Sequence, residues 1–231
     1  MAHAMEIRLL IILFFLFSCS FDNGQDKISN ISKITDLYMK KNDYDLKIFS
    51  RDEIKNIPYP LIEIRTNGIL KQALMLPLSE RNGFSNYTSG DGQNLTKNGA
   101  IISKTYGMNV GMISHRIQSR SPFLYLTKPN EWNDESFHEY EFISPSHGSK
   151  KVIVKCKIIK EKEGTIDILK IKYKTSQFSE KCSSDKYKFI NYYWVDNDGF
   201  VWKSIQWIGM DMSSKKNIYA QLYVLKKNGN N

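Results

Sequence analysis

The C-terminal run Asn217–Lys226 alternates between aliphatic and polar or aromatic residues. Alternation with a period of two predicts a β-strand, because successive side chains point to opposite faces of a sheet. One face would carry Ile218, Ala220, Leu222 and Val224, and the other Tyr219, Gln221 and Tyr223. An apolar face opposite a Tyr-rich face indicates either two buried faces or one wet face able to contact another molecule.

Similar runs, separated by turn signals, continue through most of the chain from Leu61 onward. Asn67-Gly68 and Asn98-Gly99 lie between such runs, and Asn-Gly favours a tight hairpin turn because both residues accept positive φ. Glu163-Gly164 is predicted to be a further turn, followed by a strand over 166–174 with a bulge at 168–169. The polar, Gly- and Asn-rich stretch 79–96 is predicted to be a long loop or a ragged hairpin.

These runs amount to about ten to twelve strands with short connections. The predicted fold is therefore mainly β: a large antiparallel meander sheet curled into a sandwich or barrel-like domain, which hides the sheet edges. One or two short N-terminal helices are predicted before it. The first covers about residues 28–41, from apolar residues at three- and four-residue spacing, and the second covers 51–56, ended by Pro58.

The first residues of the chain form a short apolar run, Leu9–Phe17, which ends at Ser18-Cys19. A helix that crosses a membrane needs about 20 apolar residues, so this run is too short to span one. A short apolar segment followed by a small residue is typical of a secretory signal peptide. We therefore expect residues 1–18 to be a leader.

The segment Leu16-Phe17-Ser18-Cys19 resembles the bacterial lipobox, in which the cysteine is lipidated and becomes the new first residue. The resemblance implies a lipid anchor on Cys19, and Ser20 in place of Asp implies delivery to the outer membrane. The polar stretch 19–33 would be a flexible tether, and 34–231 a single β-rich periplasmic domain. The alternative is ordinary cleavage further along, with Cys19 removed.

The whole chain carries a formal net charge of +9, which favours anionic partners. Nucleic acid is not expected as a partner outside the cytoplasm, which leaves anionic glycan or lipid head groups. The alternative is that the scattered lysines only keep the surface soluble.

Two cysteines remain if Cys19 carries lipid: Cys156 and Cys182. An even pair in an oxidising compartment is a candidate disulfide. The alternative is two buried free thiols, and neither cysteine has the spacing of a metal site.

No motif of a known active site occurs in the sequence. His115, His138 and His147 do not form a metalloprotease pattern, and G-x-S-x-G, P-loop and C-x-x-C motifs are missing. His138 is interpreted as a half-exposed strand histidine, and Asp196 and Asp198 as turn residues. We therefore predict no catalytic residue, no cofactor and no metal ligand.

Aromatic residues are concentrated near the C-terminus, where they either fill a core or contact a glycan or a protein. Alternation places Tyr193 on one face of its strand and Tyr192 and Trp194 on the other. The concentrated residues are Tyr187, Tyr192, Tyr193, Trp194, Trp202 and Trp207.

Two segments, Asn56–Pro60 followed by a strand and Tyr193–Asp196 followed by Gly199 and Val201, resemble the YjbF/GfcB-type lipoproteins. Asn56-Ile57-Pro58-Tyr59-Pro60, followed by a strand, is similar to the start of that family's domain. Tyr193-Trp194-Val195-Asp196, followed by Gly199 and Val201, is similar to its closing hairpin. The candidate contact or motif residues are Pro58, Tyr59, Tyr193, Trp194, Asp196, Gly199 and Trp202.

The resemblance implies a periplasm-facing outer-membrane lipoprotein of capsule or exopolysaccharide production. Its partners would be envelope proteins of the export system, including an outer-membrane β-barrel, and anionic glycan is a further candidate. The main hypothesis is a non-enzymatic accessory factor. The alternatives are a β-fold lipoprotein that carries a lipid or another ligand, and a periplasmic glycan-modifying enzyme.

Overall fold

The computed structural model describes residues 49–67, 72–108, 111–117, 135–144, 148–211 and 214–227. The predicted leader 1–18, the lipidated Cys19, the tether 19–33 and the predicted helix over 28–41 lie outside these residues, as does His147. Within the described ranges, no helix has the length and hydropathy needed to cross a membrane.

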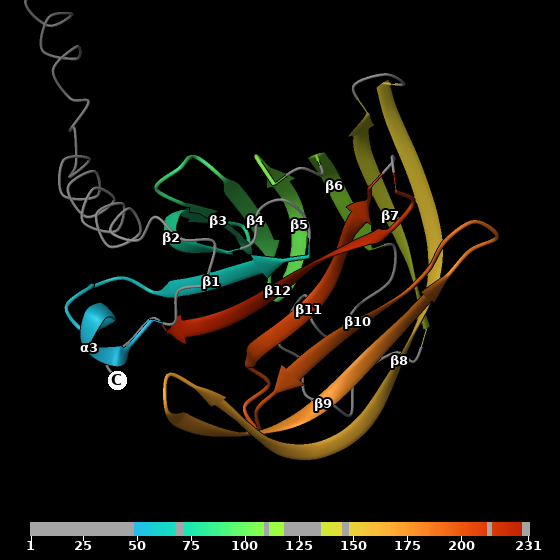
Figure 1. Cartoon of the computed structure of the whole chain (residues 1–231). Helices are drawn as coiled ribbons and strands as arrows, with labels where there is room; N and C mark the ends of the chain where they lie inside the picture. Colours follow the sequence, from blue (N-terminus) through green and yellow to red (C-terminus); the bar gives the residue numbers. More distant parts are fainter. Residues whose placement is uncertain are drawn as a thin grey trace, which may run out of the picture.

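Twelve antiparallel strands form one sheet, which curls into a nearly closed barrel (Figure 1). The predicted mainly-β meander is thus confirmed, and of the two predicted shapes the barrel is the observed one. The order is β5-β4-β3-β2-β1-β12-β11-β10-β9-β8-β7-β6, so only the β1–β12 pairing joins strands distant in sequence. The elements are α3 (Arg51–Ile54), β1 (Leu61–Thr66), β2 (Gln72–Arg81), β3 (Phe84–Thr88), β4 (Asn94–Asn98), β5 (Ile101–Tyr106), β6 (Gly111–Ile117), β7 (Glu135–Ser144), β8 (Gly148–Ile168), β9 (Ile171–Ser183), β10 (Lys188–Val195), β11 (Val201–Met210) and β12 (Asn217–Lys226).

The interior of the barrel is a packed core of aromatic and aliphatic side chains. Trp207 stacks on Phe189 with ring centroids 4.2 Å apart, and Tyr140 meets Trp207 edge-on at 5.0 Å. Ile64 and Leu222, which are paired across β1 and β12, belong to the same core. Each such side chain contributes about 1.5–3 kcal/mol on burial, which favours the inward orientation of these residues.

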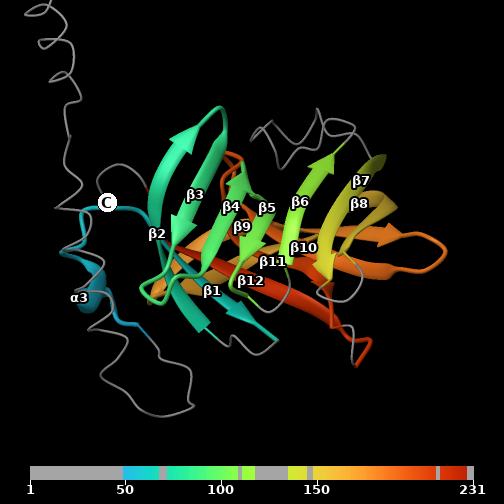
Figure 2. The same cartoon turned by 90° about the horizontal axis from the view of Figure 1, so that it is seen from above.

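The barrel closes between β5 and β6, the two ends of the strand order, which lie side by side (Figure 2). Side chains join these strands. Thr105 Oγ1 accepts a hydrogen bond from Met112 N at 3.2 Å, and His115 Nδ1 lies 2.9 Å from Ile102 O. A carbonyl only accepts, so His115 carries its proton on Nδ1. The seam is thus closed by side-chain hydrogen bonds.

Gln206 of β11 reaches across the interior to the backbone at the start of β5 and to Ala100 just before it. Its Oε1 accepts from Ile102 N at 2.9 Å, and its Nε2 donates to Ala100 O at 2.8 Å. A buried backbone group without a partner costs free energy, so this amide takes the role of a missing neighbouring strand.

Gln206→Leu is expected to lower the free energy of unfolding by about 2 kcal/mol, because it leaves two buried backbone groups without partners. Urea denaturation followed by fluorescence would measure the change. Gln177→Leu is the matched control, since Gln177 is a half-buried residue of β9. Equal stability of Gln206→Leu and the parent protein would contradict this role of the amide.

Helix α3 packs on the outside of the sheet at one end of the barrel. Ser50 and Glu53 form a capping box, which satisfies backbone donors at the start of the helix. Ile54, together with Phe49, belongs to a second buried cluster that includes Leu61 of β1 and Leu74 of β2. The predicted second helix is therefore confirmed, although it ends at Ile54, two residues early.

Of the two alternatives predicted for 79–96, the long loop was wrong and a hairpin is observed. β2 continues to Arg81, and a tight turn at Asn82-Gly83 leads into the regular strand β3. Both turn residues have positive φ, 52° and 79°, as the hairpin geometry of an Asn-Gly pair requires. The polar composition reflects strands whose side chains are mostly half-buried or exposed.

The predicted turn at Glu163-Gly164 was also wrong, because β8 runs unbroken from Gly148 to Ile168. The chain turns at Leu169 and Lys170, which have φ values of 52° and 65°. Asp167 Oδ1 accepts from Lys170 N at 2.9 Å and stabilises this turn. The slip in alternation at 168–169 therefore marks the end of a hairpin and not a bulge.

Candidate functional site

The outer face of β10, β11, β12 and β1 carries a row of side chains that are neighbours across the strands. Trp194 pairs with Lys203, Lys203 with Tyr223, and Tyr223 with Glu63. Side chains opposite each other on antiparallel strands lie within contact distance. The row therefore places a lysine between two aromatic rings.

Lys203 lies over both rings, with Nζ 4.5 Å from the Trp194 centroid and 5.1 Å from the Tyr223 centroid. Burial, followed by the nearby charge of Arg65, lowers the pKa of Lys203. No carboxylate of the described residues forms an ion pair with it. The ring faces attract the ammonium group, but its charge has no anionic partner in this part of the chain.

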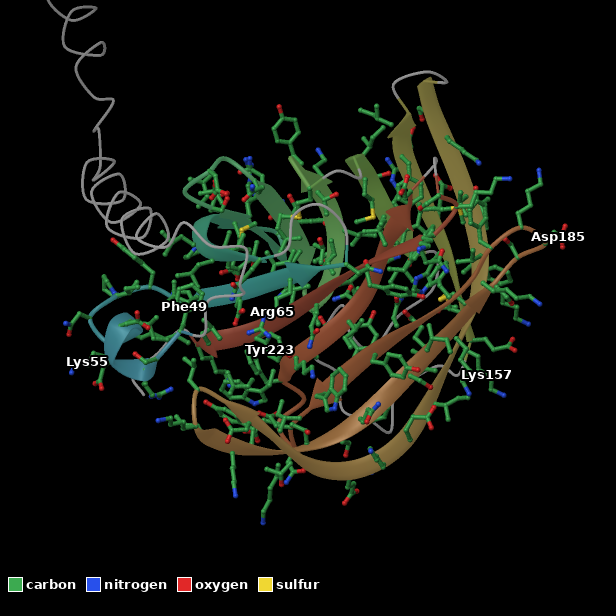
Figure 3. All side chains as sticks on the ribbon, in the orientation of Figure 1. Phe49, Lys55, Arg65, Lys157, Asp185 and Tyr223 are labelled. Carbon is green, nitrogen blue, oxygen red and sulfur yellow. A yellow bond between two sulfur atoms is a disulfide. The ribbon has the colours of Figure 1, made fainter. Side chains whose placement is uncertain are left out.

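Arg65 extends the surface next to Tyr223, as Figure 3 shows where β1 meets β12. Its Cζ lies 5.1 Å from the Tyr223 centroid, and its Nε donates to Glu63 Oε1 at 2.5 Å. Gln72 Nε2 donates to the same oxygen at 2.5 Å. Arg65 is thus neutralised by Glu63, whereas Lys203, between the two rings, has no carboxylate partner among the described residues.

A second row runs parallel to the first and continues into a hollow. Tyr192 pairs with Ile205, which pairs with Gln221. The hollow has a volume of about 620 Å³, and its outer-face lining includes Lys181, Lys188, Ile190, Tyr192, Ile205 and Tyr219. We call the combined area the outer aromatic surface; it consists of Arg65, Tyr192, Trp194, Lys203, Ile205, Tyr219, Gln221 and Tyr223. Half-buried rings, an amide and a free cation suit a ligand that is partly flat and apolar and partly anionic.

The structure does not bring the seven motif residues of the sequence together. Only Trp194 belongs to the outer aromatic surface. Tyr193 lies on the face opposite Trp194, as the alternation predicts; this face is the interior, where its hydroxyl donates to Glu180 Oε2 at 3.3 Å. Pro58 is exposed between α3 and β1, and Tyr59 packs against the cluster beneath the helix.

Asp196, Gly199 and Trp202 build the turn between β10 and β11. Asp196 Oδ1 accepts from the backbone N–H groups of Asp198 and Phe200 at 3.0 and 2.8 Å, and its Oδ2 accepts from Trp202 Nε1 at 2.8 Å. Gly199 has a φ of 84°, which favours glycine. The prediction that Asp196 and Asp198 are turn residues agrees with this geometry, and the family-like motif here organises a hairpin.

A buried polar cluster lies inside the barrel beside the Cys156–Cys182 disulfide, whose sulfur atoms are 2.02 Å apart. His115 Nε2 lies 3.0 Å from His138 Nδ1, and His138 Nε2 lies 2.9 Å from Ser136 Oγ. Since His115 donates from Nδ1, its Nε2 accepts from His138, and His138 in turn accepts from Ser136. The prediction of a half-exposed His138 was wrong, because the side chain is 0% exposed.

Glu180 completes this cluster and was missed by the sequence reasoning. Its Oε2 accepts from Asn191 Nδ2 at 2.8 Å, and its Oε1 lies 3.4 Å from His138 Nε2. Burial raises the pKa of Glu180 and lowers the pKa values of His115 and His138 to about 3. Both imidazoles are therefore uncharged at neutral pH, and burial shifts Glu180 in the direction of its protonated form.

This cluster does not have the geometry of a catalytic triad. Ser136 and Glu180 both approach the same nitrogen of His138, whereas a triad needs the hydroxyl and the carboxylate on opposite nitrogens. His138, Glu180, Cys156 and Cys182 place potential metal ligands within 4.8 Å of one another. With the sulfurs bonded to each other, no thiolate is available to bind a metal.

Comparison with known proteins places this chain in a class of lipoproteins associated with bacterial capsule. The chain belongs to the family of group 4 capsule polysaccharide lipoproteins gfcB, YjbF, which matches residues 37–215. A solved structure of similar fold is the hypothetical lipoprotein YmcC from Escherichia coli (K12). It is 18% identical with a TM-score of 0.65, and the match covers 78% of this chain and 90% of that one. No curated protein matches the sequence.

Proposed function

We propose that the protein is a non-enzymatic accessory lipoprotein of capsule or exopolysaccharide assembly and secretion. In this proposal it is anchored in the outer membrane through lipid on Cys19, faces the periplasm, and binds acidic polysaccharide on its outer aromatic surface. Envelope proteins of the export system are its expected neighbours. Membership of the capsule lipoprotein family supports the process, and the unpaired Lys203 between two rings supports the ligand.

The outer aromatic surface offers the two contacts that an acidic sugar needs. Aromatic rings such as Trp194 and Tyr223 provide flat apolar faces for the C–H face of a sugar ring. Lys203 lies between them and provides a positive charge for a carboxylate. The net charge of +9 on the chain would attract a polyanion over a longer range.

The buried cluster supports a role without catalysis. Ser136, His138 and Glu180 are the described residues that come nearest to a catalytic group, and they are 1%, 0% and 0% exposed. A substrate could not reach them without opening the barrel. Their hydrogen bonds hold neighbouring strands together instead.

Lys203→Met is expected to weaken binding of acidic capsule polysaccharide about tenfold, which corresponds to about 1.4 kcal/mol. The measurement uses the full lipidated protein in nanodiscs and polysaccharide purified from the same cells. Trp194→Ala should weaken binding to a similar extent through loss of a ring face.

The matched control is Lys104→Met, because Lys104 is an exposed lysine on β5. Carboxyl-reduced polysaccharide should bind to the parent protein as weakly as the native polymer binds to Lys203→Met. Equal affinity of the parent protein and Lys203→Met for the native polymer would refute the proposed surface.

A further inference from the structure

The end of the barrel next to α3 opens into a second pocket, separate from the outer aromatic surface. Its volume is about 430 Å³, and seven of the twelve strands or their ends contribute to its rim. Its lining includes Ile62, Glu80, Tyr87, Lys97, Lys226 and Lys227. A barrel mouth is a common place for a small ligand, since the wall encloses it on all sides.

Lys97 of β4 points into this pocket. It follows Leu95, a residue of the main core, by two positions, so both side chains are on the inner face of the strand. Its cross-strand partner Ser85 also lines the pocket. Lys97 Nζ lies 5.9 Å from the ring centroid of Tyr87, and desolvation lowers the pKa of Lys97 to about 8. At neutral pH the ammonium is therefore charged and poorly hydrated.

No carboxylate of the described residues forms an ion pair with Lys97, whereas several surface lysines have one. Lys155, for example, lies 2.8 Å from Glu135, and Lys160 lies 2.7 Å from Glu163. A cation in a partly enclosed site is costly unless an anion accompanies it. Lys97 is thus arranged to receive an anion from outside the chain.

The charged groups facing the pocket are three lysines and one glutamate. Lys226 donates to Ile57 O at 2.6 Å, and Lys227 lies 4.2 Å from the Phe200 centroid, so both are engaged with the protein. Glu80 is exposed at the rim. The pocket therefore has a net positive charge. Among the described residues, Lys97 and Lys227 have no hydrogen-bonded or anionic partner, and Lys227 lies over the Phe200 ring, closer than Lys97 lies to Tyr87.

We propose that this barrel-mouth pocket binds a carboxylate group carried on an apolar or sugar body, with the Lys97 ammonium as its counter-ion. One ammonium balances one negative charge, as a carboxylate requires. The aliphatic and aromatic lining, including Ile62, Val201, Val224 and Phe200, covers the body of the ligand. Two sources share this chemistry, namely a fatty acid and a uronic acid at a chain end. This inference does not depend on the outer aromatic surface binding polysaccharide.

Calorimetry on the full lipidated protein would test the pocket with two acids, dodecanoate below its micelle concentration and glucuronate, against dodecanol and glucose. At least one acid is expected to bind, at least tenfold more tightly than its uncharged counterpart. Lys97→Met should lose that binding at least tenfold. The Lys97→Met protein should fold and be at least as stable at neutral pH, because the variant removes a poorly hydrated charge.

The matched control is Lys157→Met, since Lys157 is exposed on β8, far from the pocket. It lies at the opposite end of the molecule from Lys55, which directly follows α3 (Figure 3). This variant and Lys203→Met should bind the acid like the parent protein, which separates this pocket from the outer aromatic surface. Binding should also raise the pKa of Lys97, measured by NMR of ¹³C-methylated lysines.

Preference for dodecanoate would identify a lipid source, and preference for glucuronate a glycan source; either supports the proposal. Failure of both acids to bind, or equal binding by Lys97→Met and the parent protein, would overturn it.

Discussion

The double substitution Cys156→Ala/Cys182→Ala is expected to lower the free energy of unfolding by about 3–4 kcal/mol. The disulfide closes a loop with a sequence separation of 26 residues, which contains the β8–β9 hairpin. In the chain-entropy description, the bond stabilises the fold by restricting the unfolded chain. Both cysteines are buried in the main core, so the substitution also removes packed sulfur atoms.

Urea denaturation of the parent and the variant would measure this loss, and the reduced parent protein provides a second comparison. Reduction should produce most of the same loss, since it breaks the cross-link without changing the side chains. Unreduced, unfolded parent protein should show no reactive thiol from this pair. A difference in the free energy of unfolding below about 1 kcal/mol would show that the disulfide restricts the unfolded chain very little.

Acidification is expected to destabilise the protein steeply between about pH 6.5 and pH 3. His115 and His138 have pKa values lowered by burial to about 3, whereas an unfolded histidine titrates near 6.5. Within this window the unfolded chain binds protons that the folded protein does not, so stability falls as the pH falls. The two residues together account for up to about 4 kcal/mol of lost stability between pH 7.5 and pH 5.

Glu180 acts in the opposite direction. Burial raises its pKa, so the folded protein keeps a proton above the pH at which an unfolded glutamate loses it. Its contribution to stability therefore falls as the pH rises above about 4.5, which offsets part of the histidine effect.

Free energies of unfolding measured at several pH values would give the net slope of stability against pH. His115→Gln should reduce this slope by the equivalent of about one bound proton. His115→Gln retains an amide donor for Ile102 O, so the comparison isolates the titration from the seam hydrogen bond. An unchanged slope in that variant would contradict the assignment.

Local patterns in the sequence were sufficient for much of the fold. The strand Asn217–Lys226 was predicted with the bounds that the structure has. The opposite orientations of Tyr193 and Trp194 followed from alternation alone. A turn was also predicted at Asn98-Gly99, and the structure has it one residue later, at Gly99-Ala100, with Asn98 as the last residue of β4. The signal at Asn82-Gly83 was overlooked because its flanking residues are polar. That error arose from treating polarity as evidence for a loop.

The sites depend on long-range register and could not be predicted in the same way. Glu180 meets His138 only because β7, β8 and β9 pair in one particular register. Lys97 faces a pocket only because the sheet closes on itself and brings β4 near the ends of β11 and β12. The row Trp194–Lys203–Tyr223 combines three strands, and its members look like ordinary strand residues when taken one at a time.

The seam between β5 and β6 is the part of the barrel that acid is expected to weaken, because its hydrogen bonds pass through His115 and His138. Protonation of His115 or His138 would disrupt the chain of hydrogen bonds that ends on Ile102 O, since each imidazole must both donate and accept there. Separation along that line would expose two strand edges with unpaired backbone groups, which are templates for association with other copies. Prolonged exposure to low pH should therefore convert the barrel into edge-paired aggregates, at a rate that rises with protein concentration.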